Sequence, residues 1–245
     1  MILIVWVVVI FISTILISQY IKTQKREDVA IAFYVLFMSM SQILAAKMGD
    51  FSIGSFTITA PVAVLIFPFT FQITDIVNEN FGQKATHRMI FIAFITQIFM
   101  TIFIWFSIEM PGGPYWGVDD QSYWTSFLGS TVRITAASWI AFLITENLDA
   151  LLFAKLKSFT KGKHLWVRNV FSDIPTLALD SLIFVSIAFG GVFPIWSIIW
   201  GQTLTKWFFG VMDTPFMYLS RGITSGKIKL DELFAKVSLK GKKER

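Results

Sequence analysis

The stretch MIFIAFITQIFMTIFIWFSI, from Met89 to Ile108, is 20 residues long and contains no ionisable side chain. A helix of about 20 predominantly apolar residues reaches across the hydrocarbon core of a bilayer. This stretch is therefore typical of a membrane-spanning helix rather than of a helix in a soluble domain.

Six other stretches meet or approach the same length, and short polar linkers separate them. They are Ile2–Ile21, Val29–Ala46, Thr59–Asn80, Phe127–Ala154, Ile174–Gly191 and Pro194–Leu219. Of the 245 residues, 55% are hydrophobic and 15% are charged, whereas a soluble domain carries roughly 25% charged residues. We therefore predict an all-α fold, a polytopic membrane helix bundle of seven transmembrane helices.

The first of these stretches has the length of a signal peptide as well as that of a helix. Ile2–Ile21 lacks a basic segment before its apolar run, and no small-residue cleavage site precedes Lys22. The pattern favours a helix that is retained in the protein.

The distribution of Lys and Arg predicts how the helices are oriented, because cytoplasmic loops of membrane proteins are enriched in these residues. With seven crossings, the linkers after the first, third and fifth helices share a side with the C-terminal tail. The basic residues on that side are Lys22, Lys25, Arg26, Lys84, Arg88, Lys155, Lys157, Lys161, Lys163, Arg168, Arg221, Lys227, Lys229, Lys236, Lys240, Lys242, Lys243 and Arg245. The opposite linkers hold Lys47 alone, which predicts an outside N-terminus and a cytosolic C-terminus.

The net charge of +5 has two readings. Basic residues beside membrane helices attract anionic lipid headgroups, and a basic tail can also bind nucleic acid. Since the charges follow the predicted topology, we expect membrane lipid as a partner and no nucleic acid.

The residues and motifs that several kinds of chemistry require are absent from this chain. There is no cysteine, and His87 and His164 are the only histidines and do not form a ligand-like cluster, so we expect no disulfide and no metal site. No Walker A, G-x-S-x-G or H-E-x-x-H sequence occurs. We therefore expect neither an enzyme nor a bound cofactor.

Ionisable residues within the predicted helices point to a polar interior. Each costs roughly 2.5–3.5 kcal/mol at bilayer depth, so such residues normally face a bundle interior or a water-filled cavity. Gln72, Asp75 and Glu79 share one helix face by their spacing. The others are Arg133, Glu146, Asp149, Asp173, Asp180, Lys206 and Asp213. We predict a polar cavity between the third, fifth, sixth and seventh helices.

Two prolines support this prediction, and two plainer readings compete with it. Pro68, placed in the middle of the third predicted helix, and Pro215 each free a backbone carbonyl, which is tolerated where it lines a cavity. On the first of these readings, Arg133, Asp180 and Lys206 form a purely structural ion network. On the second, acids near the cytosolic interface, such as Asp173, are simply solvated.

Four segments in this order carry a family resemblance. They are FPFTFQITDIVNENFGQK (Phe67–Lys84), VRITAASWIAFLITENLDALLFAKLK (Val132–Lys157), GKHLWVRNVFSDIPTLALDSLIFVSIAF (Gly162–Phe189) and KWFFGVMDTPFMYL (Lys206–Leu219). The chain resembles the queuosine precursor transporters, also described as vitamin uptake transporters, over roughly Val29–Leu219. The resemblance implies a six-helix transporter core at residues 28–220, with an additional N-terminal transmembrane helix at 1–22 and a basic cytosolic tail at 221–245.

The resemblance also implies a function, the import of 7-deazaguanine bases such as preQ0 or preQ1 across the cell (inner, cytoplasmic) membrane. These bases are precursors of queuosine or archaeosine in tRNA. A guanine-like edge offers adjacent N–H donors that one carboxylate accepts together, and the planar ring stacks on aromatic side chains. A cationic aminomethyl group, where present, favours a second carboxylate.

The expected site residues fall into groups by role. Candidate carboxylates for base recognition or proton linkage are Asp75, Glu79, Glu146 and Asp180. Candidate amide contacts are Gln72, Asn78 and Gln202, and a candidate stacking face is Trp139. Residues expected to orient and neutralise carboxylates are Arg133 and Lys206, with Asp149 and Asp213 as candidate partners.

Other functions stay open from the residues alone. A substrate-binding subunit that relies on an external ATPase fits the absence of an ATPase motif in this chain. A non-transporting membrane scaffold would use the same helices without carrying a solute. An intramembrane enzyme is disfavoured because no nucleophile and base occur together in the spans. Homodimer formation is compatible with each of these functions.

Overall fold

The computed structural model describes residues 2–53, 56–129, 132–191 and 194–228. Most of the expected cytosolic tail lies outside these residues. The described chain is helical apart from one β-hairpin and the linkers. The elements are α1 (Ile2–Gln24), α2 (Asp28–Leu44), β1 (Met48–Ile53), β2 (Phe56–Pro61), η1 (Val62–Leu65), α3 (Phe67–Phe81), α4 (Gln83–Glu109), α5 (Val118–Gly129), α6 (Val132–Phe159), α7 (Leu165–Phe189) and α8 (Ile195–Thr224).

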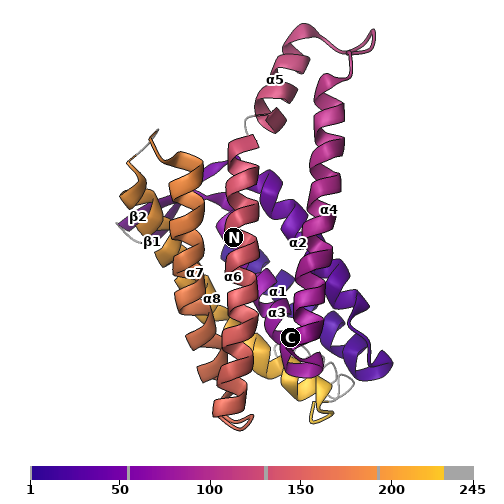
Figure 1. The fold of residues 1–245 in the computed structure, drawn as a ribbon, viewed down its shortest axis with the longest axis vertical. Helices are drawn as coiled ribbons and strands as arrows, with labels where there is room; N and C mark the ends of the chain where they lie inside the picture. The colour runs from indigo at the N-terminus through magenta and orange to yellow at the C-terminus, as the bar shows by residue number, and fades with distance from the viewer. Residues whose placement is uncertain (1, 54–55, 130–131, 192–193, 229–245) are drawn as a thin grey trace, which may run out of the picture.

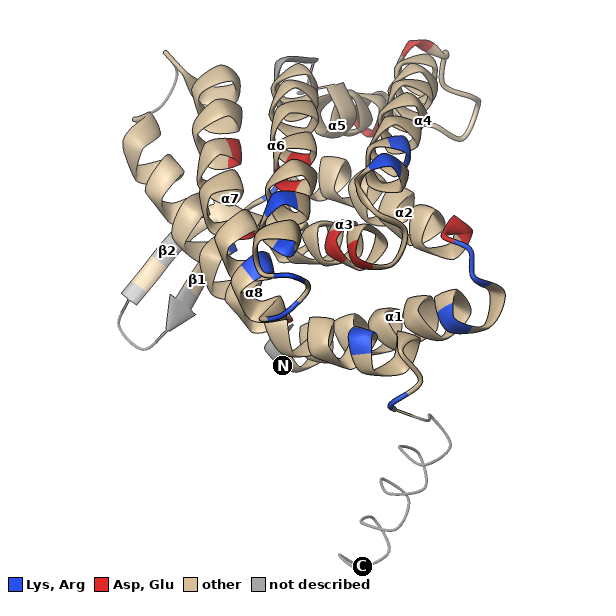
Figure 2. Cartoon of the chain, turned by 60° about the horizontal axis from the view of Figure 1, so that its bottom comes forward, with Lys and Arg blue, Asp and Glu red and all other residues tan. Residues whose placement is uncertain are grey.

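The long helices form an up-and-down bundle. In Figure 1, α4, α6 and α7 stand side by side along the long axis, and α8 packs behind α7 and also against α1. The linkers α1–α2, α3–α4 and α6–α7 lie at the lower end of this view, together with the end of α8. Lys and Arg gather at that end, which Figure 2 turns toward the viewer. This is the grouping that the predicted orientation requires, and the orientation itself stays a prediction.

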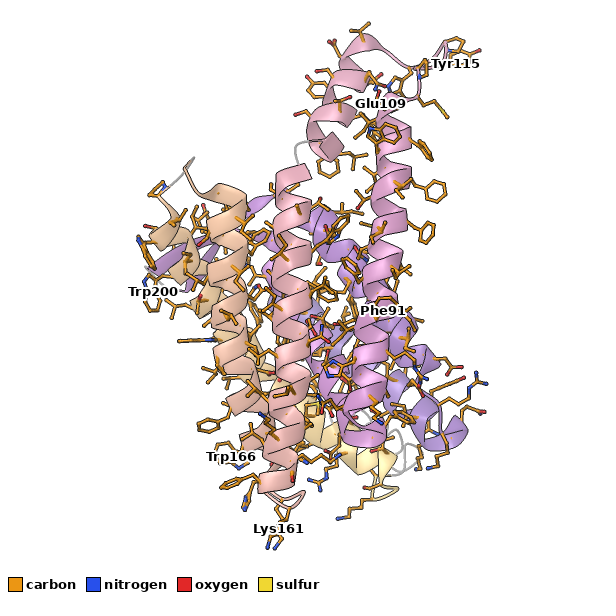
Figure 3. The ribbon with its side chains drawn as sticks, viewed as in Figure 1. Phe91, Glu109, Tyr115, Lys161, Trp166 and Trp200 are labelled. Carbon is orange, nitrogen blue, oxygen red and sulfur yellow. The ribbon has the colours of Figure 1, made fainter. Side chains whose placement is uncertain are left out.

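The predicted all-α membrane fold is confirmed. Among the residues that the structure describes, five segments are long and apolar enough to cross a membrane, and α2 is a shorter apolar helix. These five segments are Ile4–Gln24, Val62–Phe81, Gln83–Glu109, Val118–Phe159 and Leu165–Phe189. Phe91 points outward from α4 (Figure 3), and Phe103 on the same helix is also exposed, as contact with lipid requires. The count of seven crossings stays a prediction.

The third predicted helix, Thr59–Asn80, is wrong in its first part. Residues 56–61 form β2, which pairs antiparallel with β1 in the register Met48↔Pro61. The β-branched residues of β2 favour a strand, and Pro61 disfavours helical backbone at the residue before it. The helix α3 begins only at Phe67, so Pro68 lies in its first turn. The predicted mid-helix kink is therefore wrong, because a first-turn proline removes no helical hydrogen bond.

Two other boundaries differ from prediction. The linker after α4 contains α5, an exposed helix that packs on the upper end of α4 (Figure 1). Asp119 and Asp120 lie in its first turn, where the helix dipole favours negative charge. The helix α7 begins at Leu165, nine residues before the predicted start at Ile174. Asp173 is consequently two turns inside a helix and buried, so its reading as a solvated interfacial acid is wrong.

Candidate functional site

Polar side chains gather where α3, α6, α7 and α8 pack together. Each of those that follow is at most 4% exposed. They are Gln72, Asp75 and Asn78 on α3; Thr145, Glu146 and Asp149 on α6; Arg168, Asn169, Asp173, Thr176 and Asp180 on α7; and Gln202, Lys206 and Asp213 on α8. We call this set, together with Glu79 of α3, which pairs with Arg168, the polar seam. The four helices that contribute to the seam are the ones that the sequence predicts to share a polar interior.

An ion pair joins α7 and α8 in the seam. The Lys206 ammonium contacts the Asp180 carboxylate, and its nitrogen also lies 3.8 Å from the centre of the Phe67 ring. Thr145 Oγ1 donates to Asp180 Oδ1 at 3.4 Å. Lys206 thus pairs with Asp180 rather than with the expected Asp149 or Asp213.

The carboxylate of Glu146, next along the seam, accepts hydrogen bonds from two neutral hydroxyl groups. Tyr34 Oη donates to Glu146 Oε2 at 2.8 Å, and Thr74 Oγ1 donates to the same oxygen at 2.9 Å. Tyr34 on α2 was missed by the sequence analysis, because it lies in an apolar run whose spacing does not reveal the facing helix. It is fully buried, and a buried phenol normally needs a hydrogen-bond partner.

Below Glu146, acids gather around one amide. Asn169 Nδ2 donates to Asp75 Oδ2 at 2.8 Å and to Asp173 Oδ2 at 3.1 Å. Thr214 Oγ1 donates to Asn169 Oδ1 at 2.8 Å, so the amide is oriented from the other side. Asn169 was not among the expected site residues, although it lies in one of the segments that carry the resemblance. Only packing shows that it joins α3, α7 and α8.

Asp149 and Asp213 complete this group, and neither forms an ion pair among the described residues. Thr176 Oγ1 lies 3.5 Å from Asp149 Oδ1, and Asp149 Oδ2 has no hydrogen-bond partner. Both carboxylate oxygens of Asp213 are buried without a partner. Carboxylates of Asp75, Asp149 and Asp173 can place one oxygen each within 4.8 Å of one another. This geometry is able to hold a metal ion, which the sequence analysis did not expect.

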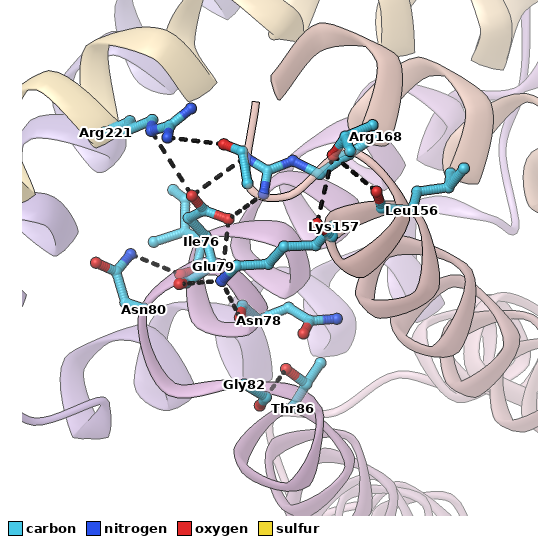
Figure 4. A network of polar contacts seen from close by, with 12 residues as sticks. Ile76, Asn78, Glu79, Asn80, Gly82, Thr86, Leu156, Lys157, Arg168 and Arg221 are labelled. Carbon is cyan, nitrogen blue, oxygen red and sulfur yellow. Dashed lines mark hydrogen bonds and ion pairs between the residues drawn. The ribbon is translucent and has the colours of Figure 1, made fainter. Parts of the chain in front are cut away.

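One end of the seam is an ion cluster around Glu79 (Figure 4). Its carboxylate lies 2.9 Å from Arg168, 3.1 Å from Lys157 and 3.7 Å from Arg221. These cations come from α7, α6 and α8, so Glu79 joins the ends of four helices. Beside it, Asn78 Nδ2 donates to the Ala150 carbonyl at 2.7 Å. Both side chains thus already have protein partners.

The remaining expected residues lie at the edge of the seam or away from it. Gln72 Oε1 accepts from Thr14 at 3.2 Å, while Gln72 Nε2 and Gln202 Oε1 are buried without partners. Trp139 packs edge-on against Phe94 of α4, with ring centres 5.9 Å apart, so it faces α4. The side chain of Arg133 lies outside the described part of the structure.

One pocket opens elsewhere than the sequence predicts. It has a volume of about 280 Å³ and lies between α2, α4, α5 and α6, with Gln42, Met100, Trp105 and Thr135 among its lining residues. None of the expected site residues lines it. The seam side chains instead pack against one another, so the interior is polar and closed in this conformation.

Comparisons with known proteins agree with the expected family. Residues 61–220 match the family described as "Putative vitamin uptake transporter". This range begins at the end of β2, so α1, α2 and β1 lie outside it, and it is narrower than the expected resemblance from Val29. No solved structure matches the chain.

Two curated relatives carry the same printed name, "Probable queuosine precursor transporter". The relative from Bacillus subtilis (strain 168) is 25% identical over 170 residues, which cover 68% of this chain and 73% of that protein. The relative from Haemophilus influenzae (strain Rd) is 26% identical over 136 residues, which cover 56% of this chain and 54% of that protein. The chain thus spans about half the length of this second relative. Since the family match extends over more than half of the chain, the protein belongs to the vitamin uptake transporter family.

Proposed function

We propose that this protein imports 7-deazaguanine bases, such as preQ0 or preQ1, across the cytoplasmic membrane. The observation that carries the proposal is the polar seam, in which buried hydrogen-bonding groups without partners lie between four helices. A buried polar group without a partner costs about 1–3 kcal/mol. A solute that satisfies several of them therefore gains binding energy, whereas a static bundle would gain nothing from keeping them. Family membership and the printed names of the two relatives support the same conclusion.

The outer half of the seam suits recognition of a guanine-like edge. Glu146 is held only by neutral donors, so its carboxylate is able to accept the adjacent N–H groups of such an edge. Gln72 Nε2 offers a free donor and Gln202 Oε1 a free acceptor, which suit the carbonyl and N–H groups of a heterocycle. We assign base contact to these three side chains, with Asp180 and Lys206 as the ion pair that borders them.

The inner half of the seam has a different role in this proposal. Glu79, with three cationic partners, closes the cytosolic end. Because Arg168 and Asp180 lie 12 residues apart on α7, the seam extends about 18 Å along the bundle. A base that enters from outside reaches Glu146 before it reaches the closed end. Release then requires the inner ends of α3, α6, α7 and α8 to separate.

The topology follows from the same reading. The chain crosses the membrane seven times, with an outside N-terminus, and α1 is added to a six-helix core at residues 28–220. Membrane lipid surrounds the bundle, which functions as a monomer or as a homodimer. The proposed topology agrees with the gathering of Lys and Arg at one end (Figure 2).

Uptake into proteoliposomes tests the proposal. Radiolabelled preQ0, preQ1 and guanine are offered to vesicles that contain wild-type protein, Glu146→Gln or the control Asp119→Asn, whose side chain is exposed on α5. We expect saturable uptake of a preQ base by the wild type and the control, and at least a tenfold lower rate for Glu146→Gln. Equal uptake by all three proteins would refute the assigned site. Absence of uptake by the wild type, even with a purified ATPase partner, would refute the function.

A further inference from the structure

We propose that Asp75, Asp149, Asp173 and Asp213 form a binding site for a hard metal cation of about the size of Ca²⁺ or Na⁺. The four side chains come from α3, α6, α7 and α8 and are at most 2% exposed. The site lies deeper in the bundle than Glu146 and uses different side chains from the proposed base contacts.

The spacing of the oxygens fits one ion. Asp75, Asp149 and Asp173 each offer an oxygen within 4.8 Å of the others. Ca²⁺ binds oxygen at about 2.3–2.6 Å, so ligands around one such ion lie at most about 4.6–5.2 Å apart, which agrees with this limit. Mg²⁺ dehydrates reluctantly and usually keeps several waters. A fully buried set of carboxylates therefore favours the larger ion.

Asp213 is the independent observation that points to a ligand. It does not belong to the three-carboxylate cluster, it is fully buried, and neither of its oxygens has a hydrogen-bond partner. Its neighbour Thr214 donates to Asn169 Oδ1, the same amide that donates to Asp75 and Asp173. Asp213 therefore approaches the cluster from α8. Ionised carboxylates this close repel one another, and a bound cation removes that repulsion.

The nearby cations do not neutralise the cluster. Arg168 precedes Asn169 on α7, but its guanidinium contacts Glu79 at 2.9 Å. Lys206 forms its ion pair with Asp180. Among the described residues, no Lys or Arg pairs with any of the four acids. Burial of unpaired charges is costly, so a bound cation would stabilise the cluster, and uptake of protons is the alternative that the experiment separates from it.

The ligand chemistry limits which ion this is. All candidate ligands are carboxylate oxygens, which suit alkali and alkaline-earth ions, whereas soft ions prefer the thiolates that this chain lacks. Asn169 already donates to Asp75 Oδ2 and Asp173 Oδ2, which holds both side chains in place and leaves Asp75 Oδ1 without a partner. Coupling of base import to a gradient of this cation rests on the proposed function, whereas the cation site itself does not.

The test measures ion binding without any base. Purified protein in detergent, stripped with a chelator, is unfolded thermally in CaCl₂, NaCl or MgCl₂ and in choline chloride of equal ionic strength. The proteins compared are wild type, Asp213→Asn, Asp149→Asn and the exposed-residue control Asp119→Asn. Equilibrium dialysis with ⁴⁵Ca²⁺ or ²²Na⁺ gives the stoichiometry for each.

We expect one ion per chain for wild type and control, with a saturable rise in Tm, and at least tenfold weaker binding to both site variants. Mg²⁺ should bind more weakly than Ca²⁺.

Equal responses of wild type and Asp213→Asn would overturn the site, because surface acids or detergent would then be responsible for the response. A wild type that binds no ion, and that only a lower pH stabilises, would assign neutralisation to protons instead. If neither site variant folds, saturable binding of one ion to the wild type still supports the site, and its absence refutes it.

Discussion

Asp75 and Glu79 lie one helical turn apart on α3, yet their surroundings differ in kind. Glu79 has three cationic partners from three other helices. Asp75 has one amide donor, from Asn169, and clusters with the carboxylates of Asp149 and Asp173. The two acids share a helix face but not an environment. One is neutralised by cations of the protein and joins the ends of four helices, whereas the other has no cationic partner among the described residues.

The comparison predicts opposite responses to the same chemical change. Loss of one partner from a buried ion pair leaves an uncompensated charge, which costs about 3–5 kcal/mol. Loss of charge from an unpaired buried acid removes a desolvation penalty instead. Replacement of either acid by its amide therefore distinguishes the two regions.

The largest effect is expected for Glu79→Gln, which leaves the fully buried Arg168 uncompensated. We expect a loss of roughly 3–5 kcal/mol in the free energy of unfolding, measured by denaturation in mixed micelles. The matched control is Glu27→Gln, whose partner Arg88 is 62% exposed, and its effect should stay below about 1 kcal/mol. Similar losses for both variants would show that the inner cluster behaves as an ordinary surface ion pair.

An intermediate effect is expected for Tyr34→Phe, which removes one of the two hydroxyl donors to Glu146. The lost hydrogen bond should lower the free energy of unfolding by about 1–2 kcal/mol. The same variant should slow base uptake, because Glu146 loses its orientation. Tyr123→Phe on the exposed helix α5 serves as control and should change neither quantity. Unchanged uptake by Tyr34→Phe would remove Glu146 from the list of base contacts.

The smallest effect on stability is expected for Asp75→Asn, measured in choline buffer without metal ions. The amide retains an acceptor for Asn169 Nδ2 and removes one of the repelling charges. The free energy of unfolding should change by less than about 1 kcal/mol or increase. A loss as large as that of Glu79→Gln would contradict the comparison, because Asp75 would then have a partner in the protein.

Much of the fold could be predicted from the sequence, since apolar length and the positions of Lys and Arg are local properties. The expected stretch Met89–Ile108 lies within α4, and the all-α membrane class is confirmed. The hairpin at Met48–Pro61 was missed because its strands are short. β1, which contains Gly49 and Asp50, resembles a polar linker, and the end of β2 adjoins an apolar run that resembles a transmembrane helix. The position of Pro68 was misjudged for the same reason.

For the site, the sequence could indicate which polar residues face the neighbouring helices, but not which partners each of them contacts. Spacing along α3 placed Gln72, Asp75 and Glu79 on one face, and all three do lie toward the neighbouring helices. Their individual environments could not be inferred, because a partner such as Arg168 is 89 residues away in the chain. Asn169 and Tyr34 were missed because neither is charged at neutral pH, and their importance arises from the acids that they contact.

The sequence by itself determined that this chain is a multi-pass helical membrane protein with acids inside its helices, because hydropathy and charge act over short distances along the chain. Only the tertiary structure decided which acids are neutralised. Electrostatic and hydrogen-bond energies depend on separations of a few Å between helices, and helix packing sets those separations. The difference between Asp75 and Glu79, one turn apart, is therefore a property of the bundle and not of α3.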